Sequence, residues 1–143
     1  MSANALLKIN GLSAGFPTPK GFLTVIDDVT IHIRAGETVC LVGESGSGKT
    51  MTSLSVMRLI DYGDGVITQG EILWKGKNLA AASQREVRAL RGKNIAMIFQ
   101  EPMTALDPVF TIGHQLLEVI LQHKNIPRKE AWEHGVFLLK RVG

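Results

Sequence analysis

The sequence predicts an α/β fold organised around a phosphate-binding loop, and three consecutive observations support that prediction. The apolar run 38–42 is typical of a short buried strand. The glycine-rich segment 43–50 follows it directly, and residues 51–60 have the pattern of a helix. A strand, a glycine-rich loop and a helix in this order form the local structure that holds phosphate groups in many α/β proteins.

The loop reads Gly43-Glu44-Ser45-Gly46-Ser47-Gly48-Lys49-Thr50 and fits the pattern G-x-x-x-x-G-K-[ST] at every position. Gly43, Gly46 and Gly48 are expected to allow positive φ angles and the close approach of a phosphate chain, so that the backbone N–H groups surround an anion at the start of a helix. Lys49 would contact the outer phosphates and the Thr50 hydroxyl would bind Mg²⁺.

Two other interpretations of this loop were weighed. One is a glycine-rich turn that binds nothing. The other is a dinucleotide-binding fingerprint, which is disfavoured because Met51 stands where that pattern requires its third glycine.

Composition limits the class of protein. The 143 residues suit one domain or a piece of a larger one, and 45% apolar with 20% charged residues is typical of a soluble globular protein. No apolar run approaches the roughly 20 residues that span a bilayer, and the first residues lack the layout of a signal peptide. The net charge of +3 includes no basic block, so no nucleic-acid partner is expected. The single cysteine, Cys40, is predicted to be a core residue in a reducing cytoplasm.

The residues before the loop predict an antiparallel opening. Residues 6–12 are predicted to form a first strand, 13–21 a turn-rich segment, and 29–33 a half-buried strand with clear alternation. Residues 34–37 are predicted to form the turn into the strand 38–42.

The residues after the loop predict alternating strands and helices. A strand is predicted over 69–74, with a turn at 75–78. Ser83 and Glu86 form a capping-box pattern, which predicts a short helix to about Leu90. The apolar run 95–99 is typical of a strand buried on both faces of a parallel sheet. Helices are predicted over 112–123 and 128–142, with Pro127 near the start of the second.

Gln100 ends the apolar run and precedes a segment bracketed by Pro102 and Pro108. A polar residue at the carboxyl end of a parallel strand often faces a ligand. The residues alone leave open whether Gln100 does so or whether this is a rigid loop without a ligand.

Three segments together resemble the ATP-binding subunit of an ABC transporter. They are the phosphate loop 43–50, the upstream Arg34-Ala35-Gly36-Glu37, and the run Phe99-Gln100-Glu101-Pro102-Met103-Thr104-Ala105-Leu106-Asp107-Pro108. The last run resembles the oligopeptide, dipeptide and nickel importer subfamily in particular, and the resemblance extends from about Leu6 to Gly143. It implies a P-loop NTPase fold with an N-terminal antiparallel portion, an ATP-binding core in residues 1–100, and the start of a helical subdomain in residues 101–143.

The resemblance also implies roles for individual residues. Gln100 would be the Q-loop glutamine, which contacts Mg²⁺ or the attacking water and reports the nucleotide state to the membrane partner. Phe16 would stack on the adenine ring, with Phe22 as the rival candidate. Residues 103–123 would begin the part that receives the membrane subunit. The implied cofactors are ATP and Mg²⁺. The implied partners are transmembrane permease subunits and a second ATP-binding subunit, at the inner face of the cytoplasmic membrane.

The family pattern includes further motifs that do not occur in these 143 residues: a Leu-Ser-Gly-Gly-Gln-like signature, a Walker B strand ending in Asp-Glu, and a switch histidine. Residues 23–28 imitate a Walker B ending, but they precede the phosphate loop and are interpreted as a loop and the start of a strand. The four histidines, His32, His114, His123 and His134, fit no switch position. An ATPase is therefore implied by family, while these residues alone are expected not to hydrolyse ATP.

Two competing hypotheses stay open beside the importer subunit. One is a nucleotide-binding module, from a split or truncated gene, that docks on a membrane subunit without turnover. The other is an unrelated P-loop kinase or NTPase, against which the run from Gln100 to Pro108 argues.

Overall fold

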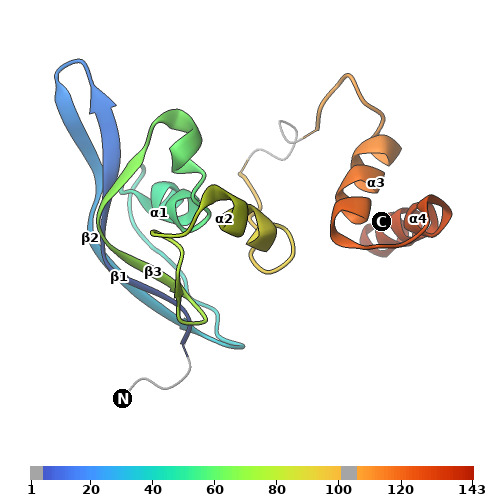
Figure 1. Ribbon diagram of the computed structural model, residues 1–143, viewed down its shortest axis with the longest axis horizontal. Coiled ribbons are helices and arrows are strands. Elements are labelled where there is room, and N and C mark those ends of the chain that lie inside the picture. The colour runs from blue at the N-terminus through green and yellow to red at the C-terminus, as the bar shows by residue number, and fades with distance from the viewer. Residues whose placement is uncertain (1–4, 101–105) are drawn as a thin grey trace. The chain divides into compact units, whose positions relative to one another are not determined.

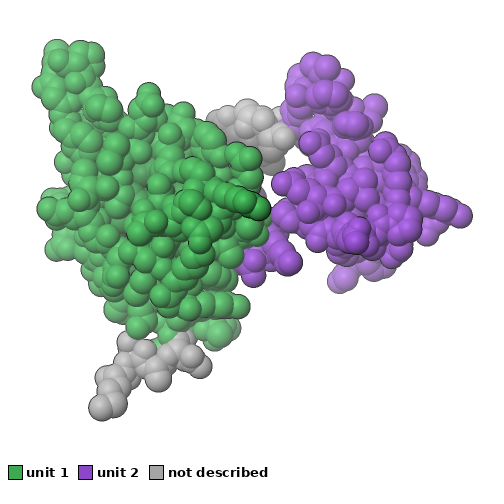
Figure 2. Space-filling view, viewed as in Figure 1, with its two compact units in different colours: residues 1–91 green, residues 92–143 purple. Residues whose placement is uncertain are grey.

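The computed structural model describes residues 5–100 and 106–143, and it consists of two compact units. Unit 1 comprises residues 1–91 and unit 2 comprises residues 92–143 (Figure 2). The predicted rigid loop between Pro102 and Pro108 lies largely outside the described residues, since 101–105 are not among them.

Unit 1 is built on a four-stranded sheet whose described strand pairs are all antiparallel (Figure 1). The strands are β1 (Ala5–Thr18), β2 (Gly21–Arg34), β3 (Val66–Trp74) and β4 (Lys77–Asn78), in the order β2-β1-β3-β4. The strands predicted over 6–12, 29–33 and 69–74 are therefore confirmed, and so is the antiparallel opening.

The predicted turn-rich segment 13–21 is wrong for residues 13–18, because β1 continues to Thr18 and pairs there with Gly21, and the turn is confined to residues 19–20. The Thr18 hydroxyl donates to the Gly21 carbonyl at 2.8 Å, which closes the hairpin. Gly15 lies within this ladder, where a Cβ would stand 2.1 Å from the Leu23 carbonyl oxygen. This glycine therefore permits close approach of two strands. Residues 23–28 likewise belong to β2 and do not form a loop.

The strand predicted over 38–42 is also wrong. These residues have no regular structure, and their backbone groups make no hydrogen bond to other described residues. Val42 is 94% exposed. Cys40 is exposed too, which overturns its prediction as a core residue. The physical reason is common to both errors: a strand needs a neighbouring strand to accept its ladder hydrogen bonds, and no described strand pairs with this segment.

The strand predicted over 95–99 fails for the same reason. Residues 96–99 have no regular structure, and Ile98 is 94% exposed. Its apolar pattern fits a parallel sheet, but the described residues form only the antiparallel sheet of unit 1.

Two helices lie on the same side of the sheet in unit 1 (Figure 1). Helix α1 (Lys49–Val56) is shorter than the predicted 51–60, and a 3₁₀ helix, η1 (Ile60–Gly63), follows it. Helix α2 (Gln84–Leu90) has the predicted capping box: the Ser83 N–H donates to the Glu86 carboxylate, and the Glu86 N–H donates to the Ser83 hydroxyl. The largest fully buried side chains of unit 1 come from the sheet, from α1 and α2, and from the segment between β4 and α2: Ile9, Leu12, Ile72, Leu79, Val87 and Ser55.

Unit 2 is a pair of helices with the predicted bounds. They are α3 (Ile112–His123), which Thr111 caps through the His114 N–H, and α4 (Arg128–Val142), which follows Pro127. The core between them contains Leu117, Ile120 and Ala131. Among the described residues, neither these nor any other helix has the length and apolar character needed to cross a membrane.

Candidate nucleotide-binding site

The phosphate loop connects the unpaired segment 38–42 to the first turn of α1. Its backbone bends at Gly46 and Gly48, which have φ angles of +82° and +85°. Both positions match the prediction, because side chains are unfavourable at these angles. The φ of Gly43 is not positive, and this glycine serves close approach instead. A Cβ there would lie 2.7 Å from the Ser47 hydroxyl, so this glycine is needed for space.

Lys49 folds back over its own loop. Its Nζ donates to the carbonyls of Gly43 at 2.8 Å and Glu44 at 2.6 Å, and to the Ser47 hydroxyl at 3.1 Å. An ammonium group has three N–H donors, and here all three are used. The charge is therefore already held at the mouth of the loop before a ligand arrives.

The loop amides have few acceptors within the protein. In the part of the chain that the structure describes, the Ser47 N–H donates to the Glu44 carbonyl at 3.3 Å, and the other N–H groups from Glu44 to Thr50 have no protein acceptor. Gly48 is the N-cap of α1, so the N–H groups of the first helical turn also face outward. Unused donors, a cation and a helix N-terminus converge here, and that combination suits an anion of several phosphate groups.

Helix α1 is held against the sheet close to this loop. A Cβ at Gly48 would lie 2.9 Å from the Val25 carbonyl oxygen of β2. Further along the helix, the side chains of Thr52 and Ser55 are buried and donate to the carbonyls of Gly48 and Met51. Packing therefore fixes the direction in which the first turn of α1 points.

Thr50 lies in the first turn of α1 with an exposed side chain, and its hydroxyl has no partner among the described residues. Within the same residues, no group of three or more His, Cys, Asp or Glu side chains is placed to hold a metal. Mg²⁺ keeps several waters and takes one or two protein oxygens together with phosphate oxygens, so a free hydroxyl beside a phosphate site fits its chemistry.

The two candidate aromatic residues sit in different surroundings on the β1–β2 hairpin. The Phe16 ring lies against Gly65, where an added Cβ would be 2.9 Å from its Cε1 atom. Phe16 is half-buried, whereas Phe22 is 47% exposed and lies against Gly15. Either ring has an exposed portion on which a base could stack.

Gln100 belongs to unit 2 and is exposed, with no side-chain partner among the described residues. The structure therefore brings together residues 43–50 in unit 1, whereas Gln100 belongs to the other unit.

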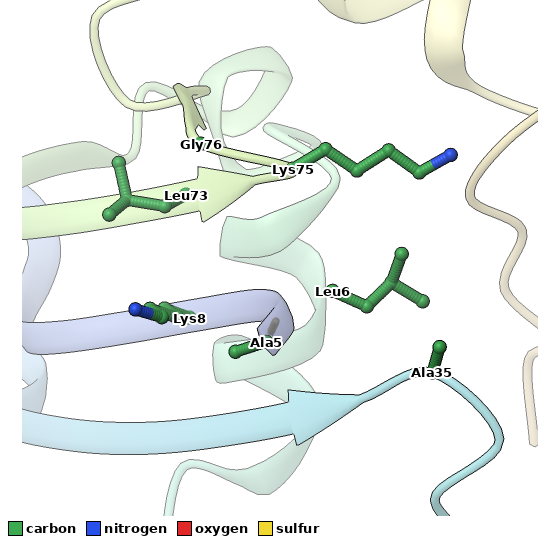
Figure 3. Close-up of a pocket in the computed structure, with 7 residues that line it drawn as sticks. All are labelled: Ala5, Leu6, Lys8, Ala35, Leu73, Lys75 and Gly76. Atoms are coloured by element: carbon green, nitrogen blue, oxygen red, sulfur yellow. The ribbon is translucent and has the colours of Figure 1, made fainter. Parts of the chain in front are cut away.

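Another cavity in unit 1 was considered. It has a volume of about 520 Å³ and contains none of the predicted site residues; it is lined by Ala5, Leu6, Lys8, Ala35, Leu73, Lys75 and Gly76. Figure 3 shows that the amines of Lys8 and Lys75 point to different sides and do not converge on one ligand. The phosphate loop is therefore the better candidate.

Sequence reasoning missed two arginines behind the site. Arg58 and Arg91 bind around the carboxyl end of α1, at the opposite end of the helix from the phosphate loop. No local pattern marks them, since their acceptors are mostly backbone carbonyls far away in the sequence.

Comparison with known proteins identifies the family. The model of the ABC transporter family matches residues 26–141. The oligopeptide transport ATP-binding protein AppD of Bacillus subtilis (strain 168) is 46% identical over 140 residues, which are 98% of this chain and 43% of that protein. OppD of Salmonella typhimurium is 41% identical over 98% of this chain and 41% of its own length. The chain belongs to the ABC transporter family, and it spans less than half the length of these relatives.

A solved structure agrees with this assignment. The dimeric bacterial ABC transporter cassette MJ0796 aligns with a TM-score of 0.79 at 20% identity, over 94% of this chain and 56% of that one. At this identity the likeness shows the fold, and it confirms the predicted fold class of an ABC-type cassette.

Proposed function

We propose that this chain is the ATP-binding part of a peptide importer of the ABC type. The observation that carries the proposal is the phosphate loop, in which free N–H groups and the Lys49 ammonium converge at the start of α1. Relatives such as AppD are named as oligopeptide transport ATP-binding proteins, which supports the substrate class.

In this proposal each residue has a defined task. The N–H groups from Glu44 to Thr50 hold the phosphate chain, and Lys49 exchanges its loop carbonyls for outer phosphate oxygens. The Thr50 hydroxyl, with Gln100, would bind Mg²⁺, which neutralises charge on the phosphates when it is bound. Phe16 would stack on the adenine.

The partners follow from the same proposal. ATP binding and hydrolysis would be coupled to transmembrane permease subunits, and a second ATP-binding subunit would complete the site. This would place the protein at the inner face of the cytoplasmic membrane. Dimeric cassettes among the solved structures support the second subunit.

The test is Lys49→Ala, with titration of a fluorescent ATP analogue. Charge-assisted hydrogen bonds contribute about 1.5–3 kcal/mol each, so affinity should fall by about tenfold or more. Lys93→Ala is the matched control, because Lys93 is exposed and has no partner among the described residues. Equal affinities for the wild type and Lys49→Ala would reject the assignment of the loop.

A further inference from the structure

Two sets of hydrogen bonds satisfy the backbone groups at the carboxyl end of α1. The Leu59 N–H donates to the Leu54 carbonyl at 2.8 Å and the Arg58 N–H donates to the Ser55 carbonyl at 3.0 Å, which together form a Schellman motif. The carbonyls of Met57 and Arg58, which this motif leaves without a partner in the helix, accept hydrogen bonds from Arg91.

Arg91 makes three directed contacts at this helix end. Its Nε donates to the Met57 carbonyl at 2.8 Å, one terminal nitrogen donates to the Arg58 carbonyl at 3.0 Å, and the other donates to the Tyr62 hydroxyl at 3.0 Å. The guanidinium carbon also lies 5.4 Å from the centre of the Tyr62 ring. This planar fork meets three acceptors at once, and a lysine, with one nitrogen on a flexible chain, cannot reproduce it.

Arg91 lies at the boundary between the two units, so its contacts with α1 bear on the segment that follows it. Arg91 is the last residue of unit 1, and the chain continues from it to Gln100 in unit 2. Helix α1 carries the phosphate loop at its amino end and Arg91 at its carboxyl end. Its eight residues span only about 12 Å, so a small movement of the helix on ligand binding would reach Arg91 directly.

We propose that Arg91 is a positioning residue that couples the phosphate site to the segment 92–100. The coupling rests on the proposed function, since it requires a ligand at the phosphate loop. When ATP draws the first turn of α1 toward the phosphates, the carbonyls of Met57 and Arg58 move with the helix. Arg91 follows them, and with it the start of the segment that leads to Gln100.

The experiment measures backbone hydrogen exchange with and without ATP and Mg²⁺ in the natural polypeptide that contains these residues. In the wild type, ATP should slow exchange in 43–50 and also in 92–100. In Arg91→Lys the slowing in 43–50 should stay within about twofold of the wild type, whereas most of the slowing in 92–100 should be lost. Arg85→Lys is the matched control, because Arg85 is exposed on α2, the helix that Arg91 caps, without a partner among the described residues, and it should behave as the wild type.

A second variant keeps the test decisive if Arg91→Lys folds poorly. Tyr62→Phe removes one of the three acceptors and leaves the backbone hydrogen bonds of Arg91 in place, so it should lose part of the slowing in 92–100. The coupling is overturned if both variants keep the wild-type slowing in 92–100, if Arg91→Lys loses the slowing in both segments, or if the wild type shows it only in 43–50. Absence of slowing in 43–50 of the wild type would instead reject the proposed function.

Discussion

Arg58→Gly is expected to change the free energy of unfolding through two effects of opposite sign. Arg58 follows α1 with a φ of +52°, a left-handed conformation that costs a non-glycine residue roughly 1–2 kcal/mol. Glycine removes this strain, but its greater freedom in the unfolded chain offsets roughly 0.5–1 kcal/mol of the gain. The backbone effect alone therefore favours glycine by about 1 kcal/mol or less.

The lost side-chain contacts act in the other direction. The guanidinium pairs with the Asp61 carboxylate at 2.7 Å and donates to the carbonyls of Leu79 at 2.9 Å and Ala80 at 2.6 Å. The side chains of Arg58 and Asp61 are only 17% and 19% exposed, so solvent replaces these contacts poorly. Removing one partner of a buried pair costs about 3–5 kcal/mol, and partial exposure lowers this to about 2–4 kcal/mol.

The contacts should therefore outweigh the strain, and Arg58→Gly should lower the free energy of unfolding by about 1–3 kcal/mol. Urea unfolding of the natural polypeptide, followed by tryptophan fluorescence, measures this difference. Arg58→Lys is the control that keeps both the charge and the strained backbone, and it should also be destabilised because it lacks the planar fork. An Arg58→Gly protein as stable as the wild type would refute the reasoning, since the strain would then dominate.

Two further predictions concern the binding of the adenine base and the stability of the protein at low pH. Phe16→Ala should lower the affinity for ATP about tenfold and leave the affinity for inorganic triphosphate nearly unchanged, because stacking on an aromatic ring contributes roughly 1–3 kcal/mol. Competition titrations measure both affinities. If Phe22→Ala shows the selective loss and Phe16→Ala does not, Phe22 is the residue that stacks on the adenine. Hydrogen bonds from Lys77 and then Ser83 lower the pKa of Glu86 from 4.5 to about 2. The stability that Glu86 contributes is therefore complete above pH 4.5 and is lost as the pH falls toward 2, and Glu86→Gln should flatten this part of the stability profile in thermal melts. A carboxyl NMR titration of Glu86 near its ordinary midpoint would contradict the assignment.

Local signals predicted the helices of unit 2 and the start of α2. Pro127 and the Ser83–Glu86 box each act within one helical turn, so a single segment contains all the information needed. The phosphate loop was predictable for the same reason, because Gly46, Gly48 and Lys49 constrain a short stretch of backbone.

The predictions from sequence were wrong where contacts with residues far away in the sequence determine the backbone conformation. Gly15 suggests a turn in the sequence, and only the Leu23 carbonyl on the neighbouring strand reveals that it serves close packing. Arg58 gives no sign of a left-handed backbone in the sequence; the Schellman motif requires that conformation, and the side chain is held there by Asp61 and by carbonyls more than 20 positions away. Propensity describes the residue itself, whereas these conformations are imposed by tertiary contacts.

The segments 38–42 and 96–99 show a second reason why strands could not be predicted from the sequence. An apolar run describes the environment for which a segment is suited, while a strand exists only when a second strand accepts its hydrogen bonds. Both segments have the apolar sequence of a buried strand, but no strand among the described residues accepts their hydrogen bonds. Val42 and Ile98 are therefore both 94% exposed. The phosphate loop therefore rests firmly on α1 and the sheet through Gly48 and its neighbours, while among the described residues the segment that enters it has no strand partner. A strand that paired with 38–42 would fix the entry of the loop through ladder hydrogen bonds, as the contacts of Arg91 fix the carboxyl end of α1.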